Sequence, residues 1–405
     1  MNVIFLSPAF PAEMPLFTHA LAACGARVLG VGEGHVGAIP KDTRDAMTAY
    51  LQVKSLWDEE AVCDEVERWL QGRSVDRVEC LWEPGVVLAA RLRERLGLRG
   101  MSVEHAVHFR DKELMKQALD RAGVRTPRHA RARTTEEART AAEEIGFPLI
   151  LKPIAGAGSA DTYHVTDGDE LDQALEMSRH VSEISVEEYI EGEEFTFDTV
   201  CANGEILFHN VAWYRPKPLT ARQNEWISSQ VIALRDTDVP EIQKGRHLGA
   251  QVMEALHFED GFTHMEWFLT PKGEAVFGEI GARAPGARVV HSMNYSCDAD
   301  LFAGWAEATL YGRISQNTDK VYNAAVVFKR ARGQGIVQRY DGLAPILARY
   351  GDRIPVVDLT PIGAPRRDWR SSVVGDGWLV ARHPNLQETL EMADKLSSEF
   401  SIIAG

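Results

Sequence analysis

Two acidic residues in the second half of the chain stand on either side of a predicted turn. Glu266 lies in the run HMEWF and Glu279 in the run FGEIGARAPG, with Pro271–Gly273 between them. Two short strands joined at that turn would bring both carboxylates to one surface, where oxygen ligands can bridge Mg2+ to phosphate groups. Arg283 would then face a phosphoryl group or a developing oxyanion. Acid pairs are also common on ordinary solvated hairpins, so this interpretation depends on residues upstream.

A lysine and a glycine-rich loop follow an apolar run. Leu149–Lys152 predicts a buried strand, and the loop after it contains Gly156, Gly158 and Ser159. Backbone N–H groups of such a loop can wrap phosphates, although the loop lacks the GxxxxGK[ST] order of a P-loop. Because a lysine that ends an apolar strand is costly to desolvate unless an anion meets it, Lys152 favours a phosphate site over a simple turn.

An acidic segment runs from a predicted strand into a turn and contains, in order, Glu187, Glu188, Tyr189, Ile190 and Glu194. Its backbone could offer a carbonyl and an N–H to an adenine edge, and Glu194 could accept hydrogen bonds from ribose hydroxyls. Taken alone, the segment is more typical of an acidic linker that faces solvent. Lys112, near the start of a predicted helix, is by itself typical of a solvated lysine.

The order of these motifs is more specific than any one of them. Lys112 comes first, followed by the strand lysine with its glycine loop, the acidic segment, and the paired acids with their arginine. In this order the chain resembles the ATP-grasp superfamily over nearly its whole length. The resemblance implies an ATP-dependent ligase that uses ATP with one or two Mg2+ ions, replaceable by Mn2+, to join a small-molecule carboxylate to an amine.

The resemblance also implies a role for each matching residue. Lys112 and Lys152 would contact phosphates, Gly156–Ser159 would close over the triphosphate, Glu187–Ile190 would form the adenine hinge, Glu194 would hold the ribose, Glu266 and Glu279 would hold the metal, and Arg283 would be the catalytic arginine. Many family members have Asn two residues after the second acid. Gly281 stands there in this chain, so water or phosphate would replace one protein oxygen.

In the family pattern a carboxylate attacks the γ-phosphate, and an amine then displaces phosphate from the resulting acyl phosphate. The form EIGARAPGARV of the acid motif is most similar to ligases that join amino acids. Arg288 could pair with a substrate carboxylate, or it could hold a helix end. His291 could line the same pocket. Trp213 could shape the pocket for the acyl side chain, and a packed surface loop is an equally good interpretation.

The remaining pattern predicts an α/β and α+β protein of several domains. Alternating strand-like and helical runs predict a doubly wound, Rossmann-like amino-terminal domain over 1–105. A small lid subdomain follows over 106–190, then a central subdomain with the metal site over 191–320 and an α+β domain over 321–405. Gly32–Gly37 fits the dinucleotide fingerprint GxGxxG, but it follows the second strand and Ala38–Pro40 interrupts any helix. We therefore expect a loop without a dinucleotide.

The amino-acid composition limits the classes of partner that the protein is expected to bind. The 405 residues are 45% hydrophobic and 25% charged, as in ordinary globular proteins, and the net charge of −15 disfavours nucleic acid and anionic membranes. The five cysteines show no CxxC pair and are expected to be reduced thiols. We find no signal peptide or membrane span and expect a cytoplasmic protein. Homodimers are common in the resembled family, although no residue locates an interface.

Three alternatives stay open at this point. A carboxylase-type relative would activate bicarbonate for a purine-pathway amine or for biotin, although the chain has no biotinyl acceptor motif. A non-catalytic nucleotide-binding module would bind ATP without turnover. A dehydrogenase would use the glycine motif at Gly32–Gly37. The set of two lysines, two acids and an arginine favours the ligase.

Overall fold

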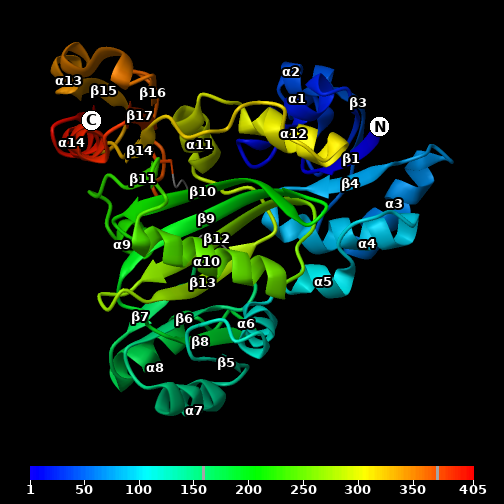
Figure 1. The fold of residues 1–405 in the computed structure, drawn as a ribbon, viewed down its shortest axis with the longest axis horizontal. Coiled ribbons are helices and arrows are strands. Elements are labelled where there is room, and N and C mark those ends of the chain that lie inside the picture. Colours follow the sequence, from blue (N-terminus) through cyan, green and yellow to red (C-terminus); the bar gives the residue numbers. More distant parts are fainter. Residues whose placement is uncertain (157–159, 371–373) are drawn as a thin grey trace.

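The computed structural model describes residues 1–156, 160–370 and 374–405 (Figure 1). Its amino-terminal part is a parallel sheet of order β3-β2-β1-β4. Val3 and Phe5 of β1 pack into one hydrophobic cluster and Ile4 and Leu6 into another, as in a parallel strand covered on both faces. The elements of this part are β1 (Asn2–Leu6), α1 (Met14–Ala23), β2 (Arg27–Gly32), α2 (Lys41–Ala46), β3 (Met47–Gln52), α3 (Glu59–Leu70), β4 (Arg77–Cys80) and α4 (Val86–Leu96).

A second, smaller sheet has the order β5-β8-β6-β7 and is antiparallel. Helices α7 and α8 pack their alanine and leucine side chains against it and lie on its outer side at the bottom of Figure 1. The elements are α5 (Val103–Val107), α6 (Lys112–Arg121), β5 (His129–Ala132), α7 (Thr135–Ile145), β6 (Leu149–Pro153), β7 (Tyr163–Val165), α8 (Gly168–Met177) and β8 (Ile184–Glu188).

The largest sheet is antiparallel, with the order β13-β12-β9-β10-β11-β14-β17-β16. Helix α10 (Pro240–Ala255) packs on one face, where a Cβ on Gly245 would lie 2.0 Å from the Trp267 ring, so the glycine permits close approach. The strands are β9 (Glu193–Ala202), β10 (Glu205–Arg215), β11 (Gln230–Ala233), β12 (Gly261–Leu269), β13 (Ala275–Gly281), β14 (Asn323–Lys329), β16 (Val356–Leu359) and β17 (Gly377–His383).

The other face of this sheet is covered by helices that also contact the amino-terminal sheet. Phe17 of α1 packs edge-on against Phe262 of β12 and Trp305 of α12, so the two sheets share one hydrophobic cluster. The remaining elements are α9 (Pro218–Gln223), α11 (Val289–Cys297), α12 (Leu301–Tyr311), β15 (Val337–Asp341), α13 (Leu343–Tyr350), α14 (Leu386–Ser398) and β18 (Ser401–Ala404), with short 3-10 turns at Val36–Ala38, Glu83–Gly85 and Gly351–Arg353.

The mixed α/β architecture predicted from the sequence is confirmed, including the parallel amino-terminal sheet. The glycine motif at Gly32–Gly37 follows β2 and leads into a 3-10 turn. The largest sheet continues across residue 320, because β14, β17 and β16 pair with it after that point. None of the helices in the described ranges combines the length and apolar character that a membrane crossing requires.

Candidate functional site

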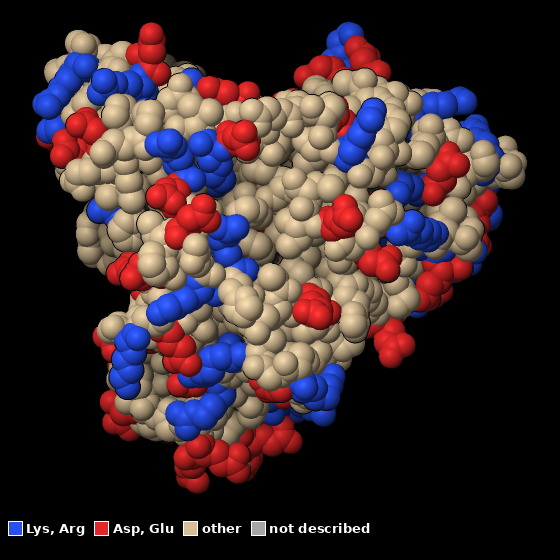
Figure 2. Space-filling model, viewed as in Figure 1, with Lys and Arg blue, Asp and Glu red and all other residues tan. Residues whose placement is uncertain are grey.

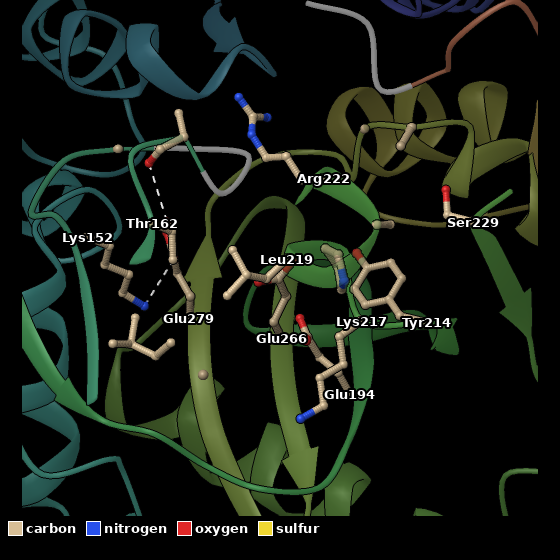
Figure 3. A pocket seen from close by; sticks show the side chains of 18 of the residues that line it. Lys152, Thr162, Glu194, Tyr214, Lys217, Leu219, Arg222, Ser229, Glu266 and Glu279 are labelled. Carbon is tan, nitrogen blue, oxygen red and sulfur yellow. Dashed lines mark hydrogen bonds and ion pairs between the residues drawn. The ribbon is translucent and has the colours of Figure 1, made fainter. Parts of the chain in front are cut away.

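A cavity of about 350 Å³ lies between the small sheet and the largest sheet (Figure 3). Its lining draws together residues from α6, β6, β8, β9, β12 and β13. Of the residues predicted from the sequence, the lining includes Lys112, Lys152, Gly156, Glu187, Glu188, Tyr189, Ile190, Glu194, Glu266, Glu279 and Arg283. Gly158 and Ser159 lie outside the described residues.

The two predicted metal-binding acids face one another across neighbouring strands. Glu266 on β12 is the register partner of Glu279 on β13, and the turn between them lies at the predicted position. Lys112 Nζ lies 2.9 Å from one Glu279 oxygen. Lys152 Nζ lies 3.8 Å from the other Glu279 oxygen (Figure 3). Burial alone would raise the pKa of Glu279, but the two ammonium groups outweigh it and hold that pKa at about 2.

These acids fit a hard divalent cation that is shared with a phosphate chain. Among the described residues, no group of three or more His, Cys, Asp or Glu side chains is placed to hold a metal by itself. Glu266 and Glu279 offer carboxylate oxygens only, and Gly281 adds none. Mg2+ prefers such oxygens and usually takes one or two carboxylates together with substrate phosphates and water. The site therefore suits a metal ion that binds with a nucleotide.

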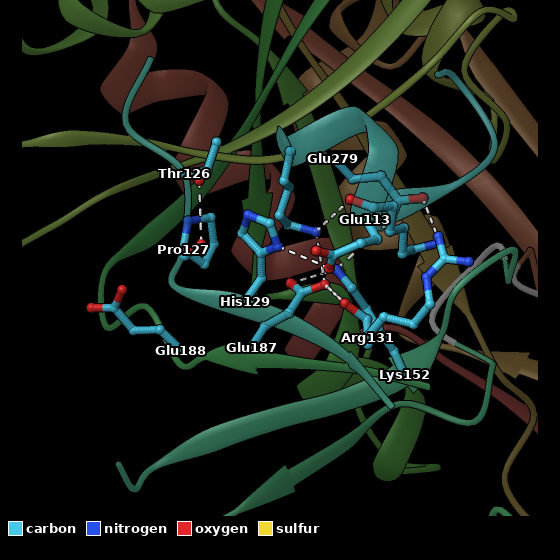
Figure 4. A network of polar contacts seen from close by, with 12 residues as sticks. Glu113, Thr126, Pro127, His129, Arg131, Lys152, Glu187, Glu188 and Glu279 are labelled. Carbon is cyan, nitrogen blue, oxygen red and sulfur yellow. Dashed lines mark hydrogen bonds and ion pairs between the residues drawn. The ribbon is translucent and has the colours of Figure 1, made fainter. Parts of the chain in front are cut away.

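Glu187 has a different side-chain environment from the one expected of an adenine hinge. Its carboxylate is buried and lies 3.0 Å from Lys152 Nζ (Figure 4). It also contacts Lys116 Nζ at 2.8 Å, and Ser185 Oγ donates to it at 2.7 Å. Burial opposes ionisation, yet the two lysines hold the pKa of Glu187 far below its usual range. The carboxylate thus serves as counter-ion to the lysines, which leaves only its backbone to a base.

Lys116 is a site residue that the motif search missed. It is fully buried on α6, one turn after Lys112, and the field of its ammonium group reaches Glu187, Lys152 and Glu279. The sequence signal was the spacing of four between two lysines at a helix start, which places both on one helix face. Together, three lysines and two carboxylates form a compact charged group on this side of the cavity.

The nucleotide-binding candidates on the other side of the cavity lie around Lys217. Its ammonium group lies 5.2 Å from the Tyr189 ring centroid and 5.9 Å from that of Phe268. Burial, aided by the nearby Glu266 carboxylate, raises the pKa of Glu194 to about 8. Glu188 points away from the charged group and pairs with Arg125 at 3.3 Å (Figure 4).

Arg283 is held by a residue from the amino-terminal part of the chain. Glu83, in the 3-10 turn after β4, is 7% exposed and accepts a hydrogen bond from Arg283 Nε at 2.6 Å. The other carboxylate oxygen of Glu83 accepts from Arg110, whose second nitrogen donates to the Ala155 carbonyl at 2.9 Å. Glu83 therefore connects three segments at the cavity wall, and the sequence motifs did not identify it.

A buried chain of polar groups supports Glu266 from behind. His264 Nδ1 lies 2.6 Å from Asp198, and His264 Nε2 lies 3.6 Å from Glu266. Asp198 is fully buried and also accepts from Thr196 Oγ1 at 2.8 Å and Asn210 Nδ2 at 3.0 Å. Burial disfavours the imidazolium, but both carboxylates raise the pKa of His264 to about 9. These polar contacts fix the orientation of the His264 imidazole beside the candidate metal ligand Glu266.

Trp213, Arg288 and His291 are not among the residues that line the cavity. Trp213 donates to Glu193 at 2.9 Å on the far side of β9. Arg288 begins α11 with a left-handed backbone and lies over the Trp378 ring at 5.1 Å. His291 lies 5.1 Å from the same ring. Their substrate-binding roles remain predictions.

Comparison with known sequences and structures adds to this geometry. Residues 109–213 match the ATP-grasp domain family. An L-arginine-specific L-amino acid ligase of Bacillus subtilis is 27% identical over 243 residues, which are 58% of each chain. An alanine–anticapsin ligase of Bacillus subtilis is 26% identical over 281 residues, 63% of this chain and 58% of the relative. The matches thus span less than two thirds of these relatives.

Solved structures show the same fold over the whole chain. An L-amino acid ligase from Bacillus licheniformis superposes with a TM-score of 0.80 at 21% identity and covers 100% of this chain and 98% of its own. N5-carboxyaminoimidazole ribonucleotide synthetase from Thermotoga maritima gives a TM-score of 0.73 at 18% identity, and the match covers 100% of this chain and 99% of the synthetase. At these identities the superpositions establish the architecture.

Proposed function

We propose that this chain, whose residues 109–213 match the ATP-grasp domain family, is an ATP-dependent carboxylate–amine ligase for small metabolites, amino acids foremost. The observation that carries the proposal is the convergence of Glu266, Glu279 and Arg283 with Lys112 and Lys152 on one cavity. Phosphoryl transfer requires chiefly positioning and neutralisation of charge, which this set of residues supplies without a protein nucleophile.

In the proposed reaction an oxygen of the substrate carboxylate attacks the γ-phosphorus, and the bond from that phosphorus to the ADP oxygen breaks. An amine nitrogen then attacks the acyl carbon, the bond to the phosphate oxygen breaks, and the amine loses a proton as the amide forms. The products are the amide, ADP and phosphate. Similarity to ligases that act on amino acids supports this course for an amino-acid pair.

Each charged residue has a separate task in this proposal. Lys112 and Lys152 bind phosphate oxygens, and Arg283, held by Glu83, neutralises charge on the phosphoryl group. Glu266 and Glu279 would hold one or two Mg2+ ions, which when bound neutralise further phosphate charge. Glu279 is paired with both lysines in this structure. On binding of nucleotide and metal, the lysines would pair with phosphate oxygens and Glu279 with the metal ion.

Water must be kept from an acyl phosphate, and the small sheet is placed to do this. Its strands β6 and β8 contribute Lys152 and Glu188 to one wall of the cavity, opposite the acids of the largest sheet. Closure of this wall over the nucleotide would exclude solvent. The predicted lid residues Gly156–Ser159 begin at this wall, and only Gly156 is among the described residues.

A carboxylase-type enzyme that activates bicarbonate is the second candidate. The N-terminal section of a carbamoyl phosphate synthase large chain from Aquifex aeolicus is 28% identical over 199 residues, 47% of this chain and 34% of that one. The fold alone does not separate this candidate from the ligase, since both kinds of enzyme share it.

Product-resolved turnover tests the proposal. Purified protein with ATP and Mg2+ is supplied with pairs of amino acids or with bicarbonate, and nucleotide products are separated. ADP and phosphate formed only with particular amino-acid pairs support the ligase. ADP that depends on bicarbonate supports the carboxylase, AMP rejects the acyl-phosphate course, and ATP binding without any turnover supports a non-catalytic module.

A further inference from the structure

The cavity extends well beyond the acids, along the middle of the largest sheet. Tyr214 on β10 pairs with Val231 on β11, Val231 pairs with Val326 on β14, and Phe328 lies further along β14. Tyr214, Val231 and Phe328 all line the same cavity, and so does Arg330, which follows β14. This far end is therefore continuous with the candidate site for phosphoryl transfer.

The two ends of the cavity differ in charge. The acids that line it are Glu83, Glu187, Glu188, Glu194, Glu266 and Glu279, and none of them comes from the segments that contribute its three lining arginines other than Arg283. The described lining residues in 214–231 and 328–370 include no Asp or Glu, whereas Arg222, Arg330 and Arg370 are among them. In a chain with a net charge of −15, this local excess of arginine is unexpected. Charges of both signs are interspersed over the face shown in Figure 2, so the excess belongs to the pocket.

Arg330 is held in place without a carboxylate partner among the described residues. One of its terminal nitrogens donates to the carbonyls of Ala221 at 2.9 Å and Asn224 at 2.8 Å, at the end of α9. Its guanidinium lies 4.9 Å from the Trp369 ring centroid. Glu225 is close enough to act electrostatically on Arg330, but its ion pair is with Arg366 at 2.7 Å. The Arg330 charge is thus not neutralised by an ion pair.

This arrangement suits recognition of an anion. The carbonyls occupy one terminal nitrogen and leave the donors on the other nitrogens of the guanidinium. The Trp369 ring and the two carbonyls restrict the movement of the group, so less conformational freedom is lost when it binds a carboxylate or a phosphate. Partial burial strengthens the attraction because little water screens it.

We propose that the substrate which fills this end of the cavity carries a second anionic group, a carboxylate or a phosphate in its side chain, and that Arg330 binds it. The inference rests on the proposed ligase function, of which it names the substrate class: an acidic amino acid or its phosphorylated analogue. Arg330 is then a specificity-determining residue, while the activated carboxylate lies near Arg283.

The test compares acidic ligands with neutral ligands of similar shape. Glutamate and phosphoserine are titrated against glutamine and serine into the full chain by calorimetry, with the ATP analogue AMP-PNP and Mg2+ present. The variants are Arg330→Gln and, as matched control, Arg332→Gln, because Arg332 is exposed and does not line the cavity. We expect the acidic ligands to bind at least ~10-fold more tightly than the neutral ones in the unaltered chain and in Arg332→Gln.

In Arg330→Gln that preference should disappear while the affinity for AMP-PNP stays unchanged. Glutamate rather than phosphoserine as the tighter ligand would identify a carboxylate, and the reverse a phosphate. Neutral ligands that bind the unaltered chain as tightly as acidic ones would overturn the inference. So would an unchanged preference in Arg330→Gln. If that variant fails to fold, Arg330→Lys keeps the charge, and the preference of the unaltered chain still decides the matter.

ADP release separates the two proposals. ADP formed only with neutral amino acids would leave the ligase function standing and overturn the inference about the second anion. Binding of an acidic ligand that depends on Arg330, without ADP release from any pair or from bicarbonate, would instead refute the ligase while the anion site stands.

Discussion

Arg283 Nε donates to Glu83 Oε2 at 2.6 Å, so the arginine at the cavity is held by a carboxylate from the turn that follows β4 in the amino-terminal part of the chain. The two residues are 200 positions apart in the chain. Burial alone would lower the pKa of Arg283, but Glu83 first, and then Glu266 and Glu279, raise it. The amino-terminal part of the chain thus takes part in the site by fixing the direction of one guanidinium.

Replacing Glu83 by Gln should therefore impair turnover more than nucleotide binding. The amide keeps the shape but removes the charge that holds Arg283 and Arg110, and we expect kcat to fall by about 10- to 100-fold, as for a misplaced electrostatic group. ADP release and ATP titration measure the two effects. Glu79→Gln is the matched control, because Glu79 is also largely shielded from solvent and paired with arginines but does not line this cavity. Equal losses in both variants would contradict the positioning role.

Glu279→Gln should abolish ADP release with little change in side-chain volume. It removes one candidate metal ligand and also the partner of Lys112 and Lys152. The second effect is visible without substrate, since the melting temperature should fall when two buried lysines lose a carboxylate. Glu274→Gln, on the same hairpin but exposed, should change neither. Full turnover in Glu279→Gln would remove this residue from the metal site.

Replacement of Glu187 or of its neighbour Glu188 on β8 should lower the free energy of unfolding by very different amounts. Glu187→Gln leaves Lys116 and Lys152 buried with a neutral partner, and we expect a loss of about 3–5 kcal/mol in unfolding free energy. Glu188→Gln breaks only partly exposed pairs with Arg125 and Arg128, which should cost about 1 kcal/mol or less. Denaturant titration of both variants decides whether Glu187 is the counter-ion that its contacts indicate.

His129 should make the small sheet less stable as pH rises. Burial disfavours the imidazolium, but hydrogen bonds to Glu113 and Asp120, each at 2.9 Å, outweigh it and raise the pKa of His129 above 6.5 (Figure 4). The group therefore contributes its full stability below pH 6.5, and that contribution is lost as pH rises through the folded-state pKa.

Thermal melting of His129→Gln and the unaltered chain across this range measures the effect. The difference in melting temperature should be largest at acidic pH and shrink as pH rises. His180→Gln is the control, because His180 is largely exposed beside Asp161. A difference for His129→Gln that does not vary with pH would mean that the imidazole acts without its charge.

Local features of the site were predictable from the sequence, and long-range ones were not. The acid hairpin around Glu266 and Glu279 depends on a few residues and a turn, and the structure places the two residues opposite one another. The contact of Arg283 with Glu83 joins distant segments that carry no shared motif. Glu187 and Glu188 lie on opposite faces of β8, and two identical residues in succession give no sign of which face is buried.

The predicted domain boundary at residue 320 also rests on local sequence pattern, which changes there. The strand pairing of the largest sheet continues across this position, because β14 pairs with β11 on one side and with β17 on the other. Such pairing between distant segments leaves no periodic signal in the sequence between them.

Because β14 pairs with β11, we expect that the carboxyl-terminal fifth of the chain, from Asn323 onward, cannot be exchanged as a separate module. Ending the polypeptide before Asn323 would remove one of the two neighbours of β11 and leave a row of free N–H and C=O groups to which other chains could pair. A hybrid with a relative would have to keep the register of Gln230 with Val327. A change of residue at position 330 is therefore better made by point substitution within the shared sheet than by exchange of the carboxyl-terminal segment.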